Sequence, residues 1–536
     1  MSAHTDRFVL DRLPQDENQP TFLFDDLNYP KMLNAADVLL EKYVALTPDA
    51  PCLLSLSERW TYRQTSEHVS RIAHVLVDDL RVVPGNCVLL RGPNSPMLAA
   101  CWLAVLKVGA IAVTTMPLYR QQELRTMIDK AEIQFGLCDT RFMGELQEAT
   151  AEHPSFVCLS FGEEGSLENL MREKPTNFVA VPTFATDPAI IAFTSGTTGV
   201  PKAAVHTHRD VLATCDTFSA KILRPSNGDL FCGSPPLGFT FGLGGLLLFP
   251  LHCGAATLLL EKAGPSELLA AIESHRVTTL FTAPVAYRAM CSLLDTHDIS
   301  SLRQCVSAGE SLALPIWEEW LRRTGVRIID GIGSTEMLHI FIACDEATLR
   351  PGATGKAVPG YRAEIHDEHG NTLPPNTVGR LAVIGPTGCT YLDDARQGTY
   401  VQQGWNYPGD TYRMDEDGYF WYVARSDDMI ISAGYNISGP EVEEALLAHP
   451  HVRECAVVAK PDPKHHTNVV KAYVVLDESM KPDDASALAL MEFCKARIAA
   501  WKAPREIEFV SDIPRTQTGK VQRYKLRERA SSELSR

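Results

Sequence analysis

Between about residues 30 and 300, short apolar runs alternate with longer stretches that carry apolar residues at helical spacing. The run 87–90 predicts a buried strand, the segment 99–106 predicts a helix, and the Pro-Gly-Asn sequence at 84–86 predicts a turn. Strands that alternate with helices are typical of βαβ units. The pattern therefore predicts parallel sheets flanked by helices.

The pattern changes twice further along the chain. From about 355 to 425, short strands and turns dominate, which predicts a small β-rich subdomain. The elements expected after Arg425 are a helix at 439–448, strands at 454–459 and 471–476, and a helix at 485–499. We therefore expect an α/β protein with a large N-terminal domain, residues 1–425, and a small α+β C-terminal domain, residues 426–536.

Length and charge narrow the class of protein. A chain of 536 residues exceeds what one hydrophobic core usually supports, so at least two domains are expected. The net charge of -16 disfavours nucleic acid and anionic membranes as partners. The longest apolar runs, 99–113 and 243–251, are too short or too interrupted to span a bilayer, and the first residues lack the apolar stretch of a secretory signal. We expect a cytoplasmic protein.

Cysteine and histidine usage gives no sign of disulfides or a metal cluster. The fourteen cysteines are scattered from Cys52 to Cys494 without a CxxC pair, which is typical of buried small hydrophobes in a reducing compartment. His206, His208 and the pair 465–466 have no companions at metal-ligand spacing. We interpret these histidines as structural or solvated.

A glycine- and hydroxyl-rich segment follows the apolar run 189–193 and ends in a lysine. Glycines let backbone N–H groups approach phosphate oxygens closely, and hydroxyls and a cation complete such a cradle. The candidate phosphate ligands are Thr194, Ser195, Gly196, Thr197, Thr198, Gly199 and Lys202. The segment predicts ATP binding.

A P-loop is the obvious alternative, but its GxxxxGK[ST] pattern places lysine directly after glycine and a hydroxyl directly after lysine. Here Val200 and Pro201 intervene, Ala203 follows the lysine, and Pro201 would interrupt a helix that began there. A polar surface linker would have a similar composition, but it would rarely lie between a strand-like run and a lysine. The sequence therefore indicates a different ATP chemistry.

The segment resembles the phosphate loop of the acyl-adenylate-forming superfamily, which includes acyl-CoA ligases, luciferases and peptide-synthetase adenylation domains. Further motifs of that family follow in its order at 307–310, 330–336, 409–410, 425–428 and 514–520, so the resemblance covers nearly the whole chain. It implies a two-step reaction. A carboxylate attacks the α-phosphorus of ATP and pyrophosphate leaves, and a thiol then displaces AMP from the acyl-adenylate.

The resemblance also implies roles for single residues in the first step. Lys520 would stabilise charge that develops between the carboxylate and the α-phosphate, Thr335 would contact that phosphate, and Glu336 would ligate Mg²⁺. The implied nucleotide contacts are Gly309, Glu310 and Ser311 near the base, Asp410 and Arg425 at the ribose, and Tyr422 alongside, with Asp330, Gly331 and Ile332 as further ATP- or AMP-binding residues. Pro408 and Ala424 replace the family's usual threonine and glycine, but they leave the functional side chains in place.

For the second step the resemblance implies a mobile C-terminal domain that rotates about Asp427. The rotation would withdraw Lys520 and bring Ser432, Gly434 and Tyr435 beside a coenzyme A tunnel. ATP, Mg²⁺ and coenzyme A are therefore the expected cofactors and co-substrates.

The acid is expected to be small and flat, because the segment 235–245 mixes aromatic residues with glycines, although a buried core turn would look similar. The candidate wall residues are Phe239, Phe241, Ala283, Ile332, Gly333, His339 and Ile340. The segment 330–341 resembles the benzoate-type CoA ligases, and the segment 114–120 resembles their anthranilate (2-aminobenzoate) branch. We therefore expect anthranilate as the substrate.

Three other readings stay open. The acid could be benzoate or a hydroxybenzoate, or the protein could be a stand-alone adenylation enzyme that loads a carrier protein. A catalytically idle nucleotide-binding protein is disfavoured by Lys520 and Glu336. A downstream acyltransferase, a carrier protein and a second copy of the chain are the protein partners that we consider.

Overall fold

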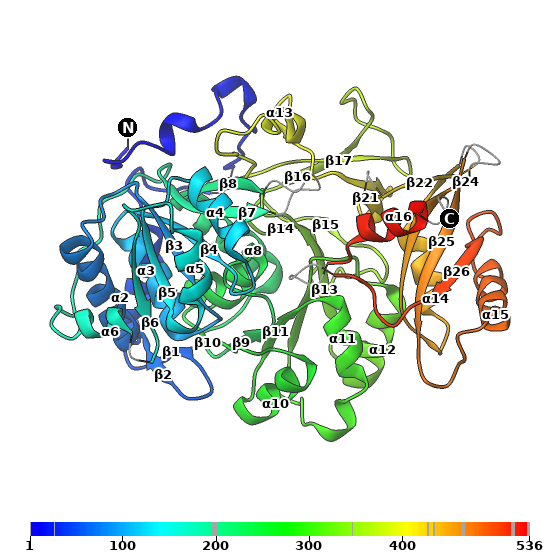
Figure 1. Cartoon of the computed structure of the whole chain (residues 1–536), viewed down its shortest axis with the longest axis horizontal. Coiled ribbons are helices and arrows are strands. Elements are labelled where there is room, and N and C mark those ends of the chain that lie inside the picture. The colour runs from blue at the N-terminus through cyan, green and yellow to red at the C-terminus, as the bar shows by residue number, and fades with distance from the viewer. Residues whose placement is uncertain are drawn as a thin grey trace.

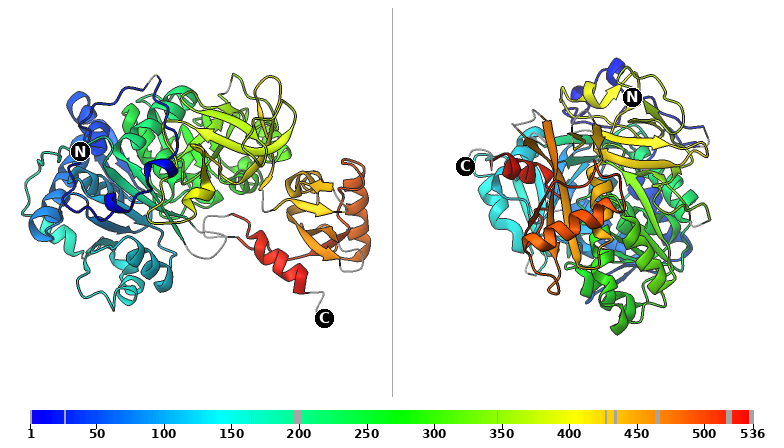
Figure 2. Two further views of the ribbon diagram at one scale, coloured as in Figure 1. Left: turned by 90° about the horizontal axis from the view of Figure 1, so that it is seen from above. Right: turned by 90° about the vertical axis from the view of Figure 1, so that its right-hand side faces the viewer.

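The computed structural model describes residues 2–25, 27–163, 165–194, 201–345, 347–425, 428–432, 435–462, 467–515 and 520–532. A large N-terminal domain carries the C-terminal domain at one end (Figure 1). Seen from above, the C-terminal domain stands beside the larger body and is joined to it along one side (Figure 2).

The first large sheet contains six strands in the order β6-β5-β3-β4-β7-β8. Their bounds are β3 Cys87–Arg91, β4 Ile111–Thr115, β5 Phe135–Asp139, β6 Val157–Phe161, β7 Pro188–Thr194 and β8 Lys202–Thr207. All neighbours are parallel except β7 and β8, which confirms the parallel sheet expected from the alternating pattern.

The second large sheet contains nine strands in the order β15-β14-β13-β12-β11-β9-β10-β1-β2. Their bounds are β1 Pro51–Leu54, β2 Arg59–Thr61, β9 Leu230–Gly233, β10 Ala256–Leu258, β11 Thr279–Thr282, β12 Gln304–Ser307, β13 Ile328–Gly333, β14 Ile340–Ala343 and β15 Lys356–Ala357. The centre is parallel and the strands at both edges are antiparallel. The active-site motifs at 307–310 and 330–336 thus follow or overlap the neighbouring strands β12 and β13.

Helices cover these sheets. Their bounds are α1 Ala35–Leu46, α2 Tyr62–His74, α3 Pro96–Lys107, α4 Gln121–Lys130, α5 Met143–Ala149, α6 Ser166–Met171, α7 His208–Thr214, α8 Thr240–Leu243, α9 Phe249–Cys253, α10 Pro265–His275, α11 Pro284–Cys291, α12 Leu314–Thr324 and α13 Gln397–Tyr400. Helix α3 is buried on almost every side, because nearly all of its residues are apolar. Ser95 caps its first turn by accepting a hydrogen bond from the Leu98 N–H at 3.2 Å, and Pro96 occupies the first helical position.

The phosphate-loop segment joins two strands of a hairpin. Strand β7 pairs antiparallel with β8, and Thr194 lies opposite Lys202. Residues 195–200, which include most of the predicted phosphate ligands, lie outside the described residues. Strand β8 begins at Lys202, which agrees with the exclusion of a P-loop.

The expected β-rich subdomain is present. Its strands follow the order β18-β19-β17-β20-β21, and β16 pairs with β17. Their bounds are β16 Arg362–His366, β17 Val378–Ile384, β18 Val401–Gln402, β19 Trp405–Asn406, β20 Asp410–Met414 and β21 Phe420–Arg425. The strand β15, near the start of the expected subdomain, instead joins the nine-stranded sheet through β14.

The C-terminal domain is an α+β unit, as expected. Its bounds are β22 Ile430–Ser432, β23 Tyr435–Ile437, α14 Gly439–Leu447, β24 Val452–Asp462, β25 Thr467–Leu476, α15 Asp484–Lys495, β26 Glu506–Phe509 and α16 Arg523–Ser532. Helix α15 ends four residues before the predicted end, and Ile498 packs against the domain core instead. The pattern did not predict β22, β23, β26 or α16.

The interpretations of cysteine and histidine are confirmed where the structure describes them. All fourteen cysteines are free, and all except Cys158, Cys253 and Cys455 are buried. His208 is buried, and its Nδ1 accepts a hydrogen bond from the Ala35 N–H at 3.1 Å. No helix among the described residues is long and apolar enough to cross a membrane.

Candidate active site

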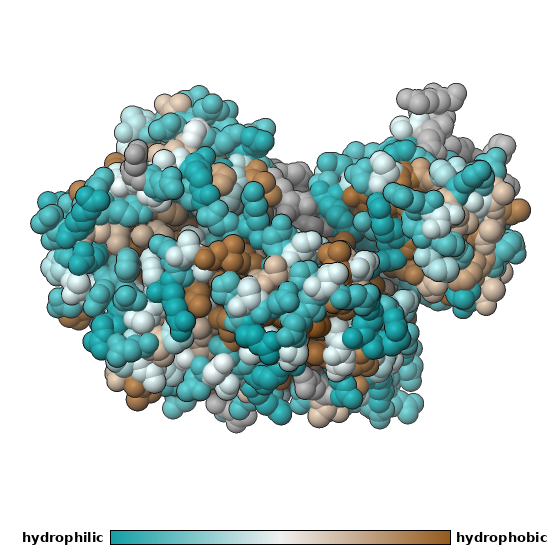
Figure 3. Space-filling view, turned by 90° about the horizontal axis from the view of Figure 1, so that it is seen from below, coloured by the Kyte–Doolittle hydropathy of each residue, from teal (hydrophilic) through white to brown (hydrophobic). Residues whose placement is uncertain are grey.

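A cavity of about 2010 Å³ is lined by residues of both domains, and Figure 3 shows the notch between the two domains on one face of the molecule. Motif residues from both domains line this cavity: Thr194, Lys202, Gly309, Glu310, Ser311, Asp330, Gly331, Ile332, Thr335, Glu336, Asp410, Tyr422, Arg425 and Lys520. Residues separated by more than 300 positions in the sequence thus meet at one site. Their mixture of carboxylates, cations and hydroxyls suits a charged, polar ligand.

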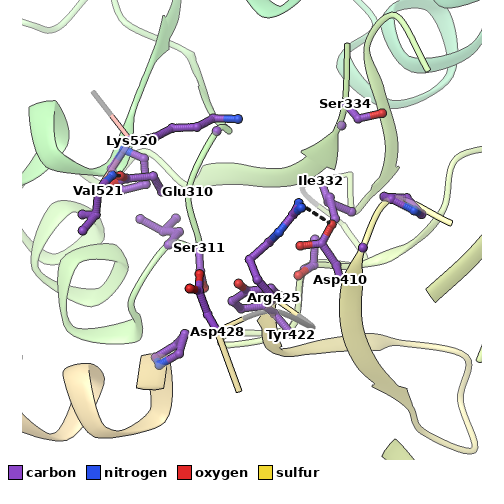
Figure 4. Close-up of a pocket in the computed structure, with 18 of the residues that line it drawn as sticks. Glu310, Ser311, Ile332, Ser334, Asp410, Tyr422, Arg425, Asp428, Lys520 and Val521 are labelled. Atoms are coloured by element: carbon purple, nitrogen blue, oxygen red, sulfur yellow. Dashed lines mark hydrogen bonds and ion pairs between the residues drawn. The ribbon is translucent and has the colours of Figure 1, made fainter. Parts of the chain in front are cut away.

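Sheet register places the two candidate ribose ligands. Asp410 begins β20, Arg425 ends β21, and the two residues lie directly opposite each other in this antiparallel pair. Arg425 Nη1 donates to Asp410 Oδ2 at 3.4 Å, as Figure 4 shows. Gly409, with φ of +84°, makes the turn into β20, and a Cβ there would lie 3.1 Å from Arg425 Nη2. The carboxylate and the guanidinium are therefore held together at the cavity wall.

Thr335 and Glu336 follow β13 and are fixed by residues outside their own segment. His206 Nε2 lies 2.7 Å from the Thr335 carbonyl oxygen and can donate to it. The Tyr391 hydroxyl donates to Glu336 Oε1 at 2.5 Å, and Lys202 Nζ donates to the same hydroxyl at 3.2 Å. One buried tyrosine thus connects the phosphate-loop lysine to the candidate magnesium ligand.

Sequence reasoning missed Tyr391. Its contacts join residues that lie 55 and 189 positions away, so no local spacing marks it. His206 was interpreted as structural, and its buried ring does orient backbone at the site.

The site can accommodate Mg²⁺ without a cluster of protein ligands. Across the described ranges, no group of three or more His, Cys, Asp or Glu is arranged to hold a metal ion. Magnesium usually takes one or two carboxylates, with substrate phosphates and water completing its shell. Glu336 borders the cavity and supplies one such carboxylate, so the residues present fit a magnesium ion that arrives with ATP.

Lys520 reaches the cavity from the C-terminal domain. Its ammonium nitrogen lies 5.6 Å from the centre of the Phe239 ring. Crowding by protein atoms, followed by the charge of Arg425, lowers the pKa of Lys520, although part of its side chain remains open to the cleft. The carboxylates of Asp410, Glu336 and Glu310 act in the opposite direction. The lysine therefore lies between an aromatic wall and the polar wall of the cavity.

The expected acid wall is only partly at the cavity surface. Phe239, Ile332 and Gly333 line the cavity, whereas Phe241, Ala283, His339 and Ile340 are not among its lining residues. The ring of His339 lies 4.6 Å from that of Phe249 and 5.8 Å from that of Phe241. Burial lowers the pKa of His339 to about 3, so its imidazole is neutral.

Glycines in the segment 235–245 serve core packing. A Cβ at Gly244 would lie 2.3 Å from His339 Cδ2, and one at Gly245 would lie 2.4 Å from Phe281 Cδ1. The sequence left a pocket and a core turn as alternatives, and the segment contributes to both.

Asp330 gives a testable pH dependence. Burial raises the pKa of this carboxyl group from its ordinary 3.8 to about 7. Folding therefore favours the protonated form, and the protein should lose stability relative to Asp330→Asn as pH rises from about 4 to about 7, with no further change above. We expect a difference of roughly 2 to 4 kcal/mol between the plateaus. Urea unfolding of both proteins at several pH values measures it, and parallel pH curves would contradict the shifted pKa.

The roles predicted for the hinge and coenzyme A residues stay predictions. Asp427 and Gly434 lie outside the described residues. Ser432 and Tyr435 pair across the β22–β23 hairpin, and Ser432 is not among the residues that line the cavity. The adjacent Asp428 does line it, and its carboxylate accepts a hydrogen bond from Arg527 of α16.

Comparisons with known proteins identify the family of this chain. The family model for AMP-binding enzymes matches residues 40–390, and the model for the C-terminal domain of these enzymes matches residues 441–520. A benzoate–CoA ligase from Thauera aromatica is 32% identical over 511 residues, which cover 94% of this chain and 97% of that protein.

Two solved structures are similar over nearly their whole length. The anthranilate CoA ligase AuaEII, solved in complex with anthranoyl-AMP, has a TM-score of 0.91 and 33% identity, covering 95% of this chain and 99% of that one. A benzoate CoA ligase from Burkholderia xenovorans LB400 has a TM-score of 0.85 and 30% identity, covering 92% and 99%. The chain therefore belongs to the family of AMP-binding enzymes, within the acyl-adenylate-forming superfamily that its motifs resemble.

Proposed function

We propose that this enzyme activates anthranilate with ATP, forms anthraniloyl-AMP and pyrophosphate, and transfers the acyl group to coenzyme A with release of AMP. The observation that carries the proposal is the position of Lys520, which faces the aromatic ring of Phe239 within the cavity that Glu336 and Asp410 line. A cation there can bind a substrate carboxylate and an α-phosphate together. Similarity to an anthranilate CoA ligase structure supports the choice of acid.

The nucleotide would lie across the wall formed by β13, β20 and β21. Asp410 would accept hydrogen bonds from the ribose hydroxyls, with Arg425 beside it and Tyr422 alongside the nucleotide. Gly309, Glu310, Ser311, Asp330, Gly331 and Ile332 border the proposed base site. Thr194, Lys202 and the segment 195–200 would bind the terminal phosphates, and Thr335 would contact the α-phosphate.

The chemistry depends on neutralising charge at the reaction centre. As the carboxylate oxygen attacks the α-phosphorus, negative charge grows on the phosphate and on the departing pyrophosphate. Lys520 would stabilise the first of these, and Lys202 the second. Glu336 would hold Mg²⁺, which when bound supplies a Lewis acid that offsets phosphate charge.

The aromatic acid would lie against Phe239, Ile332 and Gly333. Phe241, Ala283, His339 and Ile340 are proposed as a second layer of this wall. His339 is neutral and lies in an aromatic cluster, so it adds no charge that would attract a second carboxylate. A flat, singly charged acid fits this composition better than a long or dianionic acid.

ATP–pyrophosphate exchange across a panel of acids tests the function. The panel contains anthranilate, benzoate, three hydroxybenzoates and a medium-chain fatty acid, and coenzyme A is then added to the best substrate. We expect anthranilate to give the fastest exchange and coenzyme A to release AMP. Faster exchange with benzoate or a hydroxybenzoate would assign that acid as the substrate in place of anthranilate. Exchange without formation of a thioester would favour loading of a carrier protein. No exchange with any acid would contradict the proposal.

We further propose that the chain divides at residues 425–426, into an N-terminal domain with a β-rich subdomain at about 355–425 and a C-terminal domain that rotates between the two steps. Asp427 would be the hinge, and Ser432, Gly434 and Tyr435 would border the coenzyme A tunnel after rotation. A cytoplasmic location, a homodimer and a downstream acyltransferase are the remaining proposals.

The hinge gives a selective prediction. Proline fixes its own φ and restricts the residue before it, so Asp427→Pro should hinder rotation without altering the cavity. We expect exchange to stay within about threefold of wild type while thioester formation from supplied anthraniloyl-AMP falls by about tenfold or more. Asp427→Ala is the control, because it removes the side chain and keeps the backbone free. Equal rates of thioester formation in all three proteins would exclude this hinge.

A further inference from the structure

The carboxylate of Glu310 contacts the opposite domain. Glu310 follows β12 in the N-terminal domain, where the family motif places it beside the base. In the structure its Oε1 accepts from Arg515 Nη1 at 3.1 Å and from the Val521 N–H at 3.0 Å, and its Oε2 lies 3.3 Å from Arg515 Nη1. Figure 4 shows Glu310, Lys520 and Val521 grouped on one side of the cavity.

The two groups that Glu310 binds are the two ends of the segment that carries Lys520. Arg515 and Val521 form an antiparallel bridge, and the Gln522 N–H donates to the Pro514 carbonyl oxygen at 2.8 Å. Lys520 directly precedes Val521. One carboxylate of the N-terminal domain thus contacts Arg515 and Val521, which lie on either side of Lys520 in this segment.

The contact between Glu310 and Arg515 is partly shielded from solvent and joins two oppositely charged side chains. The side chains of Arg515 and Glu310 are 24% and 23% exposed. A charge-assisted hydrogen bond in such a place, joined by a backbone donor, is stronger than an ordinary surface ion pair. Breaking it should therefore cost more than breaking an ordinary surface ion pair.

Arg515 also has a partner within its own domain. Its Nη2 lies 3.2 Å from Glu454 Oε2, on β24. If the C-terminal domain rotates, Arg515 can leave Glu310 and keep Glu454, so the guanidinium stays paired. This arrangement lowers the cost of breaking the contact between the domains.

We propose that Glu310 is a positioning residue that holds Lys520 in place for adenylate formation, through Arg515 and Val521, and releases it for the thiol step. We call the Glu310–Arg515–Val521 contact the latch. The inference rests on the proposed function, in which Lys520 serves the first step alone. It assigns Glu310 an action through Lys520, which differs from binding the base.

The half-reactions test the latch. Glu310→Ala should lower the rate constant of adenylate formation by about 10- to 30-fold, because it removes a charge-assisted contact and a backbone acceptor. Glu310→Gln keeps an acceptor for Val521 and should lose less, and Arg515→Gln should resemble it. The double variant Glu310→Gln/Arg515→Gln should be no slower than either single variant, because the two residues act as one unit. Thioester formation from supplied acyl-AMP should fall much less than adenylate formation in each of them, whereas an equal fall in both steps would overturn the latch.

Glu454→Gln is the matched control, since it removes a partner of the same guanidinium without touching the contact between domains. It should retain adenylate formation. A loss in this variant equal to that in Glu310→Gln would overturn the latch, as would additive effects of Glu310→Gln and Arg515→Gln.

Two measurements need no catalysis. The Val521 amide should exchange hydrogen faster in Glu310→Ala than in wild type, because its acceptor is gone. The affinity for AMP, measured by calorimetry, should change by less than about threefold, whereas a role at the base would weaken it in step with the rate. Unchanged exchange at Val521 would overturn the latch, and so would a parallel loss of AMP affinity. If wild type activates no acid, the proposed function fails, while exchange at Val521 still decides whether the contact exists.

Discussion

Lys520→Ala should abolish adenylate formation and spare the thiol step. The lysine ammonium reaches the cavity beside Phe239, and no other residue of the C-terminal domain is assigned to the reacting carboxylate. Loss of one preorganised group that stabilises transition-state charge costs on the order of 3 kcal/mol, or roughly a hundredfold or more in rate. Single-turnover formation of the adenylate measures the first step, and conversion of supplied anthraniloyl-AMP to the thioester measures the second.

The control for this variant is Lys481→Ala, which removes an exposed lysine elsewhere in the C-terminal domain. It should match wild type in both steps. Lys520→Arg should recover little activity, because a planar guanidinium cannot reproduce the compact ammonium charge. Equal loss of both half-reactions in Lys520→Ala would refute the assignment of Lys520 to the first step.

Glu336→Gln should produce the other large loss. Glu336 is 8% exposed as a residue, and its carboxylate accepts a hydrogen bond from the Tyr391 hydroxyl. Replacement by an amide removes the one charged metal ligand proposed here while the shape is kept. We expect a loss of roughly a hundredfold or more in adenylate formation, because a metal ion that polarises a phosphoryl oxygen is worth several kcal/mol of transition-state stabilisation. The Mg²⁺ concentration that gives half-maximal exchange should rise as well.

Tyr391→Phe tests the hydrogen bond to Glu336 independently of the charge of its carboxylate. It leaves Glu336 charged but removes the hydroxyl shared with Lys202. Residues that orient a metal ligand typically contribute about 10- to 100-fold, so the variant should shift the Mg²⁺ dependence less than Glu336→Gln does. Glu368→Gln, an exposed position, is the control. A normal Mg²⁺ dependence in Glu336→Gln would show that this carboxylate does not bind the metal.

Much of the fold follows from local pattern. The alternation of apolar runs and helical stretches predicted the parallel sheets, and turn residues marked the β-rich subdomain. The pattern failed where packing or pairing decided the outcome. Helix α15 ends early although the residues that follow favour helix, because Ile498 packs against the domain core. Strand β15 lies near the start of the expected β-rich subdomain but pairs with β14 of the nine-stranded sheet, and strand pairing of this kind cannot be read from local spacing.

The residues of the candidate site also fall into those that local motifs predict and those that only the structure reveals. Glycines, hydroxyls and charged residues in fixed order predicted the residues that meet at the cavity, because they form contiguous motifs. Tyr391 and the latch partner Arg515 act through contacts that join distant segments, and only the structure brings them together. The acid wall was the hardest part to predict. The sequence around Phe241 and His339 does not distinguish a residue that faces a ligand from one that faces the core. Burial placed both in an aromatic cluster.

The fate of the carboxylate oxygens tests the acyl-adenylate route most directly. Anthranilate labelled with ¹⁸O in its carboxylate is converted to the thioester with ATP and coenzyme A. Mass spectrometry then measures the label in AMP, pyrophosphate and inorganic phosphate. Attack of the carboxylate on the α-phosphorus, followed by displacement by the thiol, leaves one labelled oxygen in AMP and none in pyrophosphate. Label in inorganic phosphate, or AMP without label, would contradict the account.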